Sequence, residues 1–282
     1  MKTFLSITII GVFLLLSTNG LHAQKKSQAE KLVKALETKD CTKAKFLVES
    51  VESVNYKDIK GISLLELGSY YGCFDVVKSL LDKGATVDLK DTVGATALLV
   101  ASQQGNIEIV KLLLDNGAQL DLQSTIGFTA LIQASEGGHS EVVKFLLDKG
   151  AKIDLQQTDG GTALIAASLL GHTEVVKLLM DKGANLDIQQ SQGATALIFA
   201  SLRGNTEVVK QLLDKGANLN LGTNNGITAL MGATHSGHTE IVKLLLDKGA
   251  NPNLKDNEGK TAIDYAVKSD IKTLFATYMK KQ

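Results

Sequence analysis

Apolar residues recur along this chain in two alternating helical patterns. Within residues 157–189, a first pattern over 162–170 is rich in small and branched residues, and a second over 173–181 gathers Val and Leu on one broad face. Thr162 supplies a hydroxyl that predicts the N-terminal cap of the first helix. Gly183 follows the second helix, where a backbone of positive φ favours glycine. An extended stretch then leads onward, so the pattern predicts helical hairpins joined by turns.

The same 33-residue pattern repeats without insertion between residues 58 and 255. A single hairpin cannot bury its apolar face alone, so neighbouring units must stack. The period therefore predicts an all-α repeat solenoid that forms a curved, elongated stack. Two series of glycines mark the period: Gly61, Gly94, Gly127, Gly160, Gly193, Gly226 and Gly259, and Gly84, Gly117, Gly150, Gly183, Gly216 and Gly249.

This register predicts the organisation of the chain. Residues 24–57 keep the register but lack both glycines and carry several lysines, which predicts an N-terminal capping repeat. Residues 256–282 begin in register and then diverge, which predicts a C-terminal capping repeat. Six complete repeats are expected between the caps, over residues 58–90, 91–123, 124–156, 157–189, 190–222 and 223–255.

Five repeats open their first helix with Thr-Ala-Leu, at Thr96, Thr129, Thr162, Thr195 and Thr228. With the period and the hairpin pattern, these triplets resemble the ankyrin repeat, a β-turn plus two antiparallel helices with a T-P-L-H-x-A signature. Here Ala replaces the proline, and Leu, Ile or Met replaces the histidine. The resemblance implies helix-turn-helix units with β-turn fingers. It implies no particular function, because such scaffolds carry many.

The first residues predict export. Lys2 precedes an apolar run over residues 4–16, and Leu21-His22-Ala23 follows, as in a secretory signal peptide cleaved after Ala23. A helix of that run spans about 20 Å, against about 30 Å of membrane hydrocarbon, which disfavours an uncleaved anchor. We expect a signal peptide over residues 1–23 and an exported chain, periplasmic or secreted and not inserted in a membrane. The style of the repeats favours a bacterial source and leaves eukaryotic secretion open.

Charge and motifs narrow the function. Thirty Lys and Arg balance thirty Asp and Glu, so no long-range field attracts nucleic acid, and we expect none as a partner. No catalytic or nucleotide-binding motif is recognisable, and we expect no enzymatic activity and no cofactor. A periodic series of acids precedes a Lys by three residues and an Asp by seven, which predicts ion pairs along exposed helices: Glu108, Glu141, Glu174, Glu207 and Glu240.

Histidines at one repeat position do not predict a metal site. Asn106 and Asn205 occupy the same position in other repeats, which favours a polar turn residue that opens the second helix. His235 and His238 are three residues apart but lack a third ligand. We therefore expect no metal. The histidines that share the position are His139, His172 and His238.

Cys41 and Cys73 are the two cysteines of the chain. They occupy adjacent positions of neighbouring repeats, and a disulfide needs Cα atoms within about 7 Å. A full stacking step is near 10 Å, which favours two separate thiols. The alternative is a disulfide that pins the N-terminal cap.

Positions that vary between the repeats are candidates for partner recognition. They cluster in the turn before each first helix and at the groove-facing end of that helix. Large apolar residues with one Arg, on a surface low in charge, are typical of a protein-binding hot spot. The alternative is drift, with Leu169, Leu170 and Phe199 packed between repeats. The predicted partner-binding residues are Tyr70, Tyr71, Gln103, Gln104, Ile126, Phe128, Glu136, Leu169, Leu170, Phe199, Leu202, Arg203 and His235.

These observations predict an exported, non-enzymatic and monomeric protein that binds another protein through its concave face and turns. One alternative is an inhibitor or immunity-type protein that caps a toxin or an enzyme. Another is binding of a small ligand or carbohydrate in the groove, through Tyr70 and Tyr71.

Overall fold

The computed structural model describes residues 27–280 of the chain. The predicted signal peptide, with its cleavage after Ala23, lies outside the described residues. Within residues 27–280 the secondary structure is helical, apart from two isolated β-bridges that join Lys57 to Ser63 and Gly222 to Thr228. Consecutive helix pairs stack on one another, so the predicted all-α repeat solenoid is confirmed.

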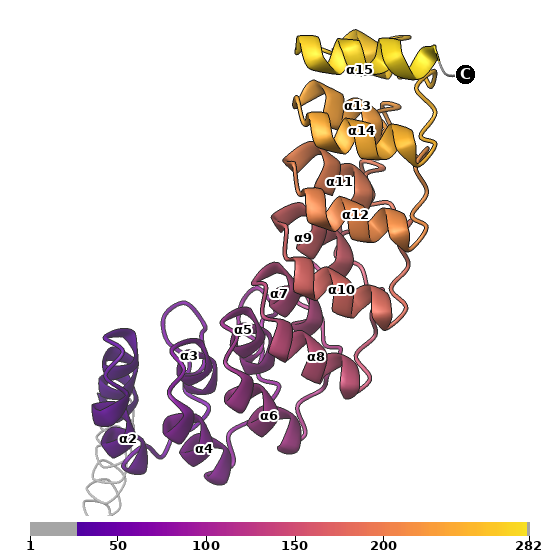
Figure 1. Cartoon of the computed structure of the whole chain (residues 1–282). Coiled ribbons are helices and arrows are strands. Elements are labelled where there is room, and N and C mark those ends of the chain that lie inside the picture. The colour runs from indigo at the N-terminus through magenta and orange to yellow at the C-terminus, as the bar shows by residue number, and fades with distance from the viewer. Residues whose placement is uncertain (1–26, 281–282) are drawn as a thin grey trace, which may run out of the picture. The chain divides into compact units, whose positions relative to one another are not determined.

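The chain divides into two compact units, with the boundary between Gln119 and Leu120. In the first unit, helix α3 packs against α5, while α4 packs against both α2 and α6 (Figure 1). The helices of this unit are one over residues 27–37, then α2 (Cys41–Glu49), α3 (Leu64–Tyr70), α4 (Phe74–Asp82), α5 (Ala97–Gln103) and α6 (Ile107–Asp115).

The second unit repeats the hairpin four times and then ends differently. Its first helices stack as one layer and its second helices as another (Figure 1). The first helices are α7 (Ala130–Glu136), α9 (Ala163–Leu170), α11 (Ala196–Arg203) and α13 (Ala229–His235). The second helices are α8 (Ser140–Asp148), α10 (Thr173–Asp181), α12 (Thr206–Asp214) and α14 (Thr239–Asp247). A 3₁₀ turn η1 (Ala262–Tyr265) and helix α15 (Ser269–Met279) follow.

Local chemistry sets the ends of the helices as the sequence predicts. The Thr162 hydroxyl accepts a hydrogen bond from the backbone N–H of Ile165 at 3.3 Å, which caps α9. Gly183 follows α10 with a φ of 88°, a left-handed conformation that a side chain would strain. At Gly193 the constraint is also steric, because a Cβ there would lie 2.6 Å from the backbone N of Asn224 in the next repeat.

The core lies between the two layers of helices. Val175, Val176 and Leu179 of α10 are buried, whereas Glu174 and Lys177 on the same helix are exposed. Full burial of one such apolar side chain stabilises a fold by about 1.5–3 kcal/mol. Because each helix pair buries its apolar face against its neighbours, stability depends on stacking.

In both units, a polar residue that opens a second helix also ties that helix to the preceding repeat. His172 Nε2 lies 2.9 Å from the carbonyl oxygen of Glu136, and Asn205 Nδ2 donates to the Ser168 carbonyl oxygen at 2.8 Å. In the first unit, Asn106 Nδ2 donates to the Ser69 carbonyl oxygen at 2.8 Å. These residues occupy the N-cap position without a side-chain bond to their own helix.

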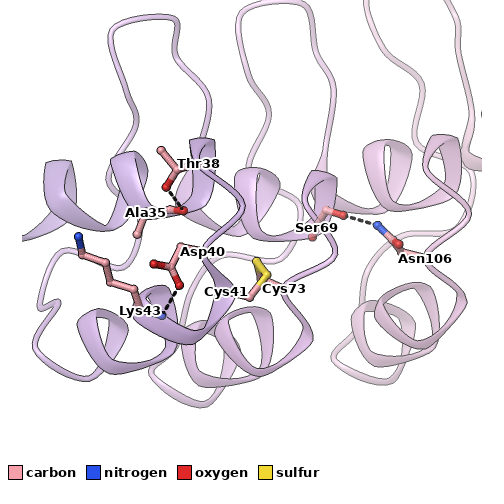
Figure 2. The surroundings of a disulfide bond; sticks show 8 residues. All are labelled: Ala35, Thr38, Asp40, Cys41, Lys43, Ser69, Cys73 and Asn106. Atoms are coloured by element: carbon pink, nitrogen blue, oxygen red, sulfur yellow. Dashed lines mark hydrogen bonds between the residues drawn. A yellow bond between two sulfur atoms is a disulfide. The ribbon is translucent and has the colours of Figure 1, made fainter.

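A disulfide takes the place of this hydrogen bond at the first junction. Cys73 occupies the N-cap position of α4 and is bonded to Cys41, with a Cα–Cα distance of 5.3 Å (Figure 2). The expectation of two separate thiols was therefore wrong. Cys41 is the first residue of α2, and because α2 packs against α4, the starts of these helices lie closer together than a full stacking step.

The ion pairs differ from the expected pattern. One pair of the predicted type forms within a helix, between Lys111 Nζ and Glu108 Oε1 at 2.9 Å. Others join neighbouring repeats, because a lysine at the end of one second helix reaches the aspartate that ends the previous one. These pairs are Lys182–Asp148 at 2.7 Å, Lys215–Asp181 at 2.8 Å and Lys248–Asp214 at 2.8 Å, and Lys210–Glu240 at 3.0 Å also spans two repeats.

Candidate functional site

Most of the predicted partner-binding residues lie at the C-terminal ends of the first helices. We call these helix ends the recognition row. Stacking uses the helix sides, and each helix then ends in a turn, as α9 does at Gly171 with a left-handed backbone. The row consists of Tyr70 and Tyr71 at the end of α3, Gln103 and Gln104 at α5, Glu136 at α7, Leu169 and Leu170 at α9, Leu202 and Arg203 at α11, and His235 at α13.

Five of the predicted residues come together in the second unit. They line a cavity of about 240 Å³, which we call the leucine hollow. Three successive repeats contribute to it. Its predicted members are Phe128, Glu136, Leu169, Leu170 and Phe199, and its further lining residues are Gln157, Asp159, Gly161, Thr162, Ile165, Ala166 and Gln190.

The leucine hollow combines apolar walls with polar groups. Leu170 is 50% exposed, whereas Leu169 and Phe199 are half-buried, so part of this apolar surface also packs between repeats. Asp159 and Gln157 supply polar atoms at the same site. An apolar centre with polar groups around it suits an apolar side chain of another protein.

The remaining predicted residues of the second unit line neither this cavity nor the one described below. Ile126 is 54% exposed, and its carbonyl oxygen accepts a hydrogen bond from Thr158 N at 3.1 Å, which links two turns. Leu202 is 39% exposed. Arg203 is exposed, and the exposed His235 ring stands edge-on to Tyr265, with centroids 5.9 Å apart.

A second cavity, of about 250 Å³, lies in the first unit. We call it the tyrosine hollow. Tyr70 and Tyr71 meet edge to face there, with ring centroids 4.9 Å apart and planes at 88°. Burial raises the pKa of the Tyr71 hydroxyl, and the charge of Glu37 adds to the rise. Gln103 and Gln104 are exposed and lie outside the hollow. Its lining residues are Glu37, Asp58, Lys60, Ile62, Glu66, Leu67, Tyr70, Tyr71 and Val100.

Glu66 lines the tyrosine hollow but was not among the residues predicted from the sequence. This carboxyl group belongs to α3 and is only 4% exposed, and its Oε2 atom is buried. Burial is the main cause that raises its pKa from 4.5 to about 8, and the charge of Asp91 is the next. The signal lay in the 33-residue register, because the equivalent positions of the other five complete repeats are all apolar: Leu99, Ile132, Ile165, Ile198 and Met231.

Within residues 27–280, no group of three or more His, Cys, Asp or Glu is placed to hold a metal ion. No described helix combines the length and the apolar character that crossing a membrane requires.

The fold and the recognition row together define a helical-repeat scaffold that presents variable side chains from constant hairpins. The family model described as "Ankyrin repeats (3 copies)" matches residues 65–157, 150–223 and 216–278. The crystal structure of the human ASB11 ankyrin repeat domain is similar, with a TM-score of 0.69 and 29% identity over 75% of this chain and 96% of that one. A comparison with curated protein sequences found no match.

The chain belongs to the ankyrin-repeat family. Ankyrin repeats are in general modules of protein–protein interaction, and their fold is typically a scaffold without catalytic activity.

Proposed function

We propose that this ankyrin-repeat protein is exported and binds another protein, without catalysis, through the recognition row and the turns that precede the first helices. The leucine hollow is the observation that carries this proposal. Phe128, Leu169, Leu170 and Phe199 converge there from three repeats, although they are far apart in sequence. Large apolar side chains around a small cavity are typical of the centre of a protein interface.

Preorganisation supports the same function. The walls of the leucine hollow belong to or adjoin α7, α9 and α11, whose stacking exists before any partner arrives. A surface that is already ordered loses little conformational freedom on binding, which leaves more of the contact energy for affinity.

The disulfide supports the proposal of export. Disulfides persist in oxidising compartments and are rare in the cytosol. The Cys41–Cys73 bond therefore agrees with the signal peptide that the sequence predicts over residues 1–23. Fractionation of producing cells, with N-terminal sequencing of the mature chain, tests this part. A cytosolic chain that retains residues 1–23 would contradict it.

The binding proposal predicts the effect of one triple variant. This variant combines Leu169→Ser, Leu170→Ser and Leu202→Ser, and so removes apolar surface from two neighbouring helix ends. Leu170 and Leu202 are exposed. We expect this variant to unfold in one cooperative transition near that of the parent and to lose capture of the partner in quantitative affinity purification. A matched Lys177→Ser variant, on the exposed face of α10, should keep capture.

Two outcomes would redirect the proposal. If the triple variant loses its cooperative transition, the three leucines belong to the core. If the captured partner is an enzyme or toxin whose activity falls on binding, the protein is an inhibitor. Thermal-shift screening against sugars and metabolites tests the small-ligand alternative, which the sequence places at Tyr70 and Tyr71.

A further inference from the structure

A buried carboxyl group in the first unit stands at a position that the other five complete repeats fill with apolar residues, whereas the C-terminal capping repeat has Asp264 there, in a capping box with Thr261. Glu66 is 4% exposed, and the equivalent Leu99 of the next repeat is 1% exposed. Burial of a carboxyl group without full hydrogen bonding costs stability, which an apolar residue would avoid. Because the same fold accepts Leu, Ile or Met at this position, packing alone does not account for Glu66.

The charged groups around Glu66 are mostly acidic, so they do not balance a negative charge on its carboxylate. After burial, the charge of Asp91 is the largest influence that raises the pKa of Glu66, and a side-chain hydrogen bond between the two residues adds to the rise. The Oδ1 atom of Asp91 also accepts backbone N–H groups of Val93 at 2.9 Å and Ala95 at 2.7 Å. Asp58 is bound in the same way by its own turn, and it also raises the pKa of Glu66. Glu37 adds a further negative charge to the cavity, and Lys60 is the one basic side chain among its lining residues.

The aromatic rings add a second feature that favours cations. Tyr70 and Tyr71 stand at right angles beside the acidic groups, and the face of an aromatic ring attracts a positive charge. The volume of about 250 Å³ is below that of a typical drug-sized ligand site but suits the end of one side chain.

We propose that the tyrosine hollow binds the cationic end of an arginine or lysine side chain of the partner protein, with Glu66 as the buried counter-charge and Tyr70 and Tyr71 as aromatic walls. The proposal deepens the protein-binding function and rests on it, since the side chain comes from the partner. A guanidinium or ammonium group in the hollow would place a positive charge beside the buried carboxyl group of Glu66.

Binding of a cation would displace a proton. Since the pKa of Glu66 is about 8 in the free protein, this carboxyl group is mostly protonated near neutral pH. A cation favours the ionised carboxylate, so Glu66 releases its proton to solvent as the ligand binds. Affinity should therefore rise between about pH 7 and about pH 9, by at most about tenfold, because the ionised fraction of Glu66 rises from about a tenth to about nine tenths.

A structural role for Glu66 is the competing explanation. Glu66 lies three residues after Ser63, whose hydroxyl accepts the Glu66 backbone N–H at 3.1 Å, and a backbone hydrogen bond from Ser63 lowers the pKa of Glu66. That pattern is a capping box, in which Gln serves as well as Glu. Glu66→Gln therefore preserves the cap and removes the charge, which separates the two roles.

The test uses small probes on the whole mature chain labelled with ¹⁵N. N-acetyl-L-arginine amide, N-acetyl-L-lysine amide and the uncharged N-acetyl-L-citrulline amide are titrated at about pH 7 and about pH 9, where arginine keeps its charge. We expect the two cations to shift the backbone amide signals of Glu66, Tyr70 and Tyr71, several-fold more tightly at the higher pH, and citrulline to shift none of them. Glu66→Gln should lose the pH dependence, and the matched Glu108→Gln variant on α6 should keep it.

Three results would overturn the proposal. These are the absence of shifts with either cation at tens of millimolar, equal shifts with citrulline, or unchanged binding in Glu66→Gln at the higher pH. The experiment contains no partner protein, so its failure leaves the docking role of the leucine hollow standing. Failure of partner capture, with the cation shifts present, would instead reject the protein-binding function and leave a free cation site.

Discussion

The two hollows of the recognition row are built from equivalent parts of the repeat but differ in chemistry. In the tyrosine hollow, acidic groups and two aromatic rings surround the buried Glu66. In the leucine hollow, Ile165 stands at the position of Glu66, and apolar residues such as Leu169, Leu170 and Phe199 line the cavity together with polar ones such as Glu136 and Asp159. One scaffold thus presents a cation-favouring cavity in the first unit and an apolar cavity in the second.

The comparison shows how little of the repeat must change to alter recognition. The cap hydroxyl is kept in both units, by Ser63 in one and Thr162 in the other, and each accepts the backbone N–H three residues later. The helix backbone therefore places residue 66 and residue 165 alike. A single substitution at that position decides whether the cavity wall carries a charge.

The largest effect on stability is expected at a junction between repeats. The disulfide joins the first repeat to the second, and in the chain-entropy view closing its loop stabilises the unit by about 3–4 kcal/mol. We expect Cys73→Ser, or reduction of the parent protein, to lower the stability of the first unit by that order. Hydrogen exchange checks this, since α2 and α4 should lose protection and α10 and α12 should keep it. Equal protection with and without reductant would contradict the prediction.

Replacement of Glu66 should give the second largest effect on stability. Its folded pKa of about 8 lies above the ordinary value of 4.5, so the folded chain holds this proton more tightly than the unfolded chain. The tighter binding of this proton therefore stabilises the folded unit fully below about pH 4.5, and this stabilisation is lost as the pH rises towards 8. Glu66→Leu should remove this slope and stabilise the first unit near neutral pH by about 2–3 kcal/mol.

Denaturant unfolding at a series of pH values measures that effect. The parent and Glu108→Gln, whose exposed carboxylate pairs with Lys111, should show the same slope. A Glu66→Leu variant that is less stable than the parent at neutral pH would mean that the buried carboxyl group stabilises the unit.

The hydrogen-bonded junctions of the second unit should give the smallest effect. Asn205→Ala removes the bonds from Nδ2 to the carbonyl oxygens of Ser168 at 2.8 Å and Leu169 at 3.1 Å. We expect a loss of about 1 kcal/mol, seen as faster exchange at the junction of α9 and α12. Asn205→His should restore the parent behaviour, because His172 makes the equivalent contact. If His fails to rescue, the two residues are not interchangeable at this position.

The fold was predictable because the same sequence pattern recurs in every complete repeat. The limits of α10, the cap at Thr162 and the positive φ of Gly183 follow from patterns that recur every 33 residues. Features that depend on distances between neighbouring repeats were not predicted. The Cys41–Cys73 bond and the Lys182–Asp148 pair depend on the relative placement of two helices, which the pattern along one helix does not define.

The candidate site was predictable only in part. Variation between repeats selected the residues of the leucine hollow, because that comparison picks out large side chains at the helix ends. Glu66 was not selected in this way, because only the turns and the ends of the helices were compared. Its role depends on burial and on Asp91, which become visible only when both turns are placed around α3.

Site-specific crosslinking in producing cells shows whether the leucine hollow contacts a partner protein. A photoreactive amino acid at position 170, in the leucine hollow, is compared with the same group at position 177 on the exposed face of α10. If the partner binds at the leucine hollow, position 170 yields a discrete adduct with one protein and position 177 does not. Identical patterns at the two positions, or no adduct at position 170 under conditions where the whole chain still captures its partner, would contradict it.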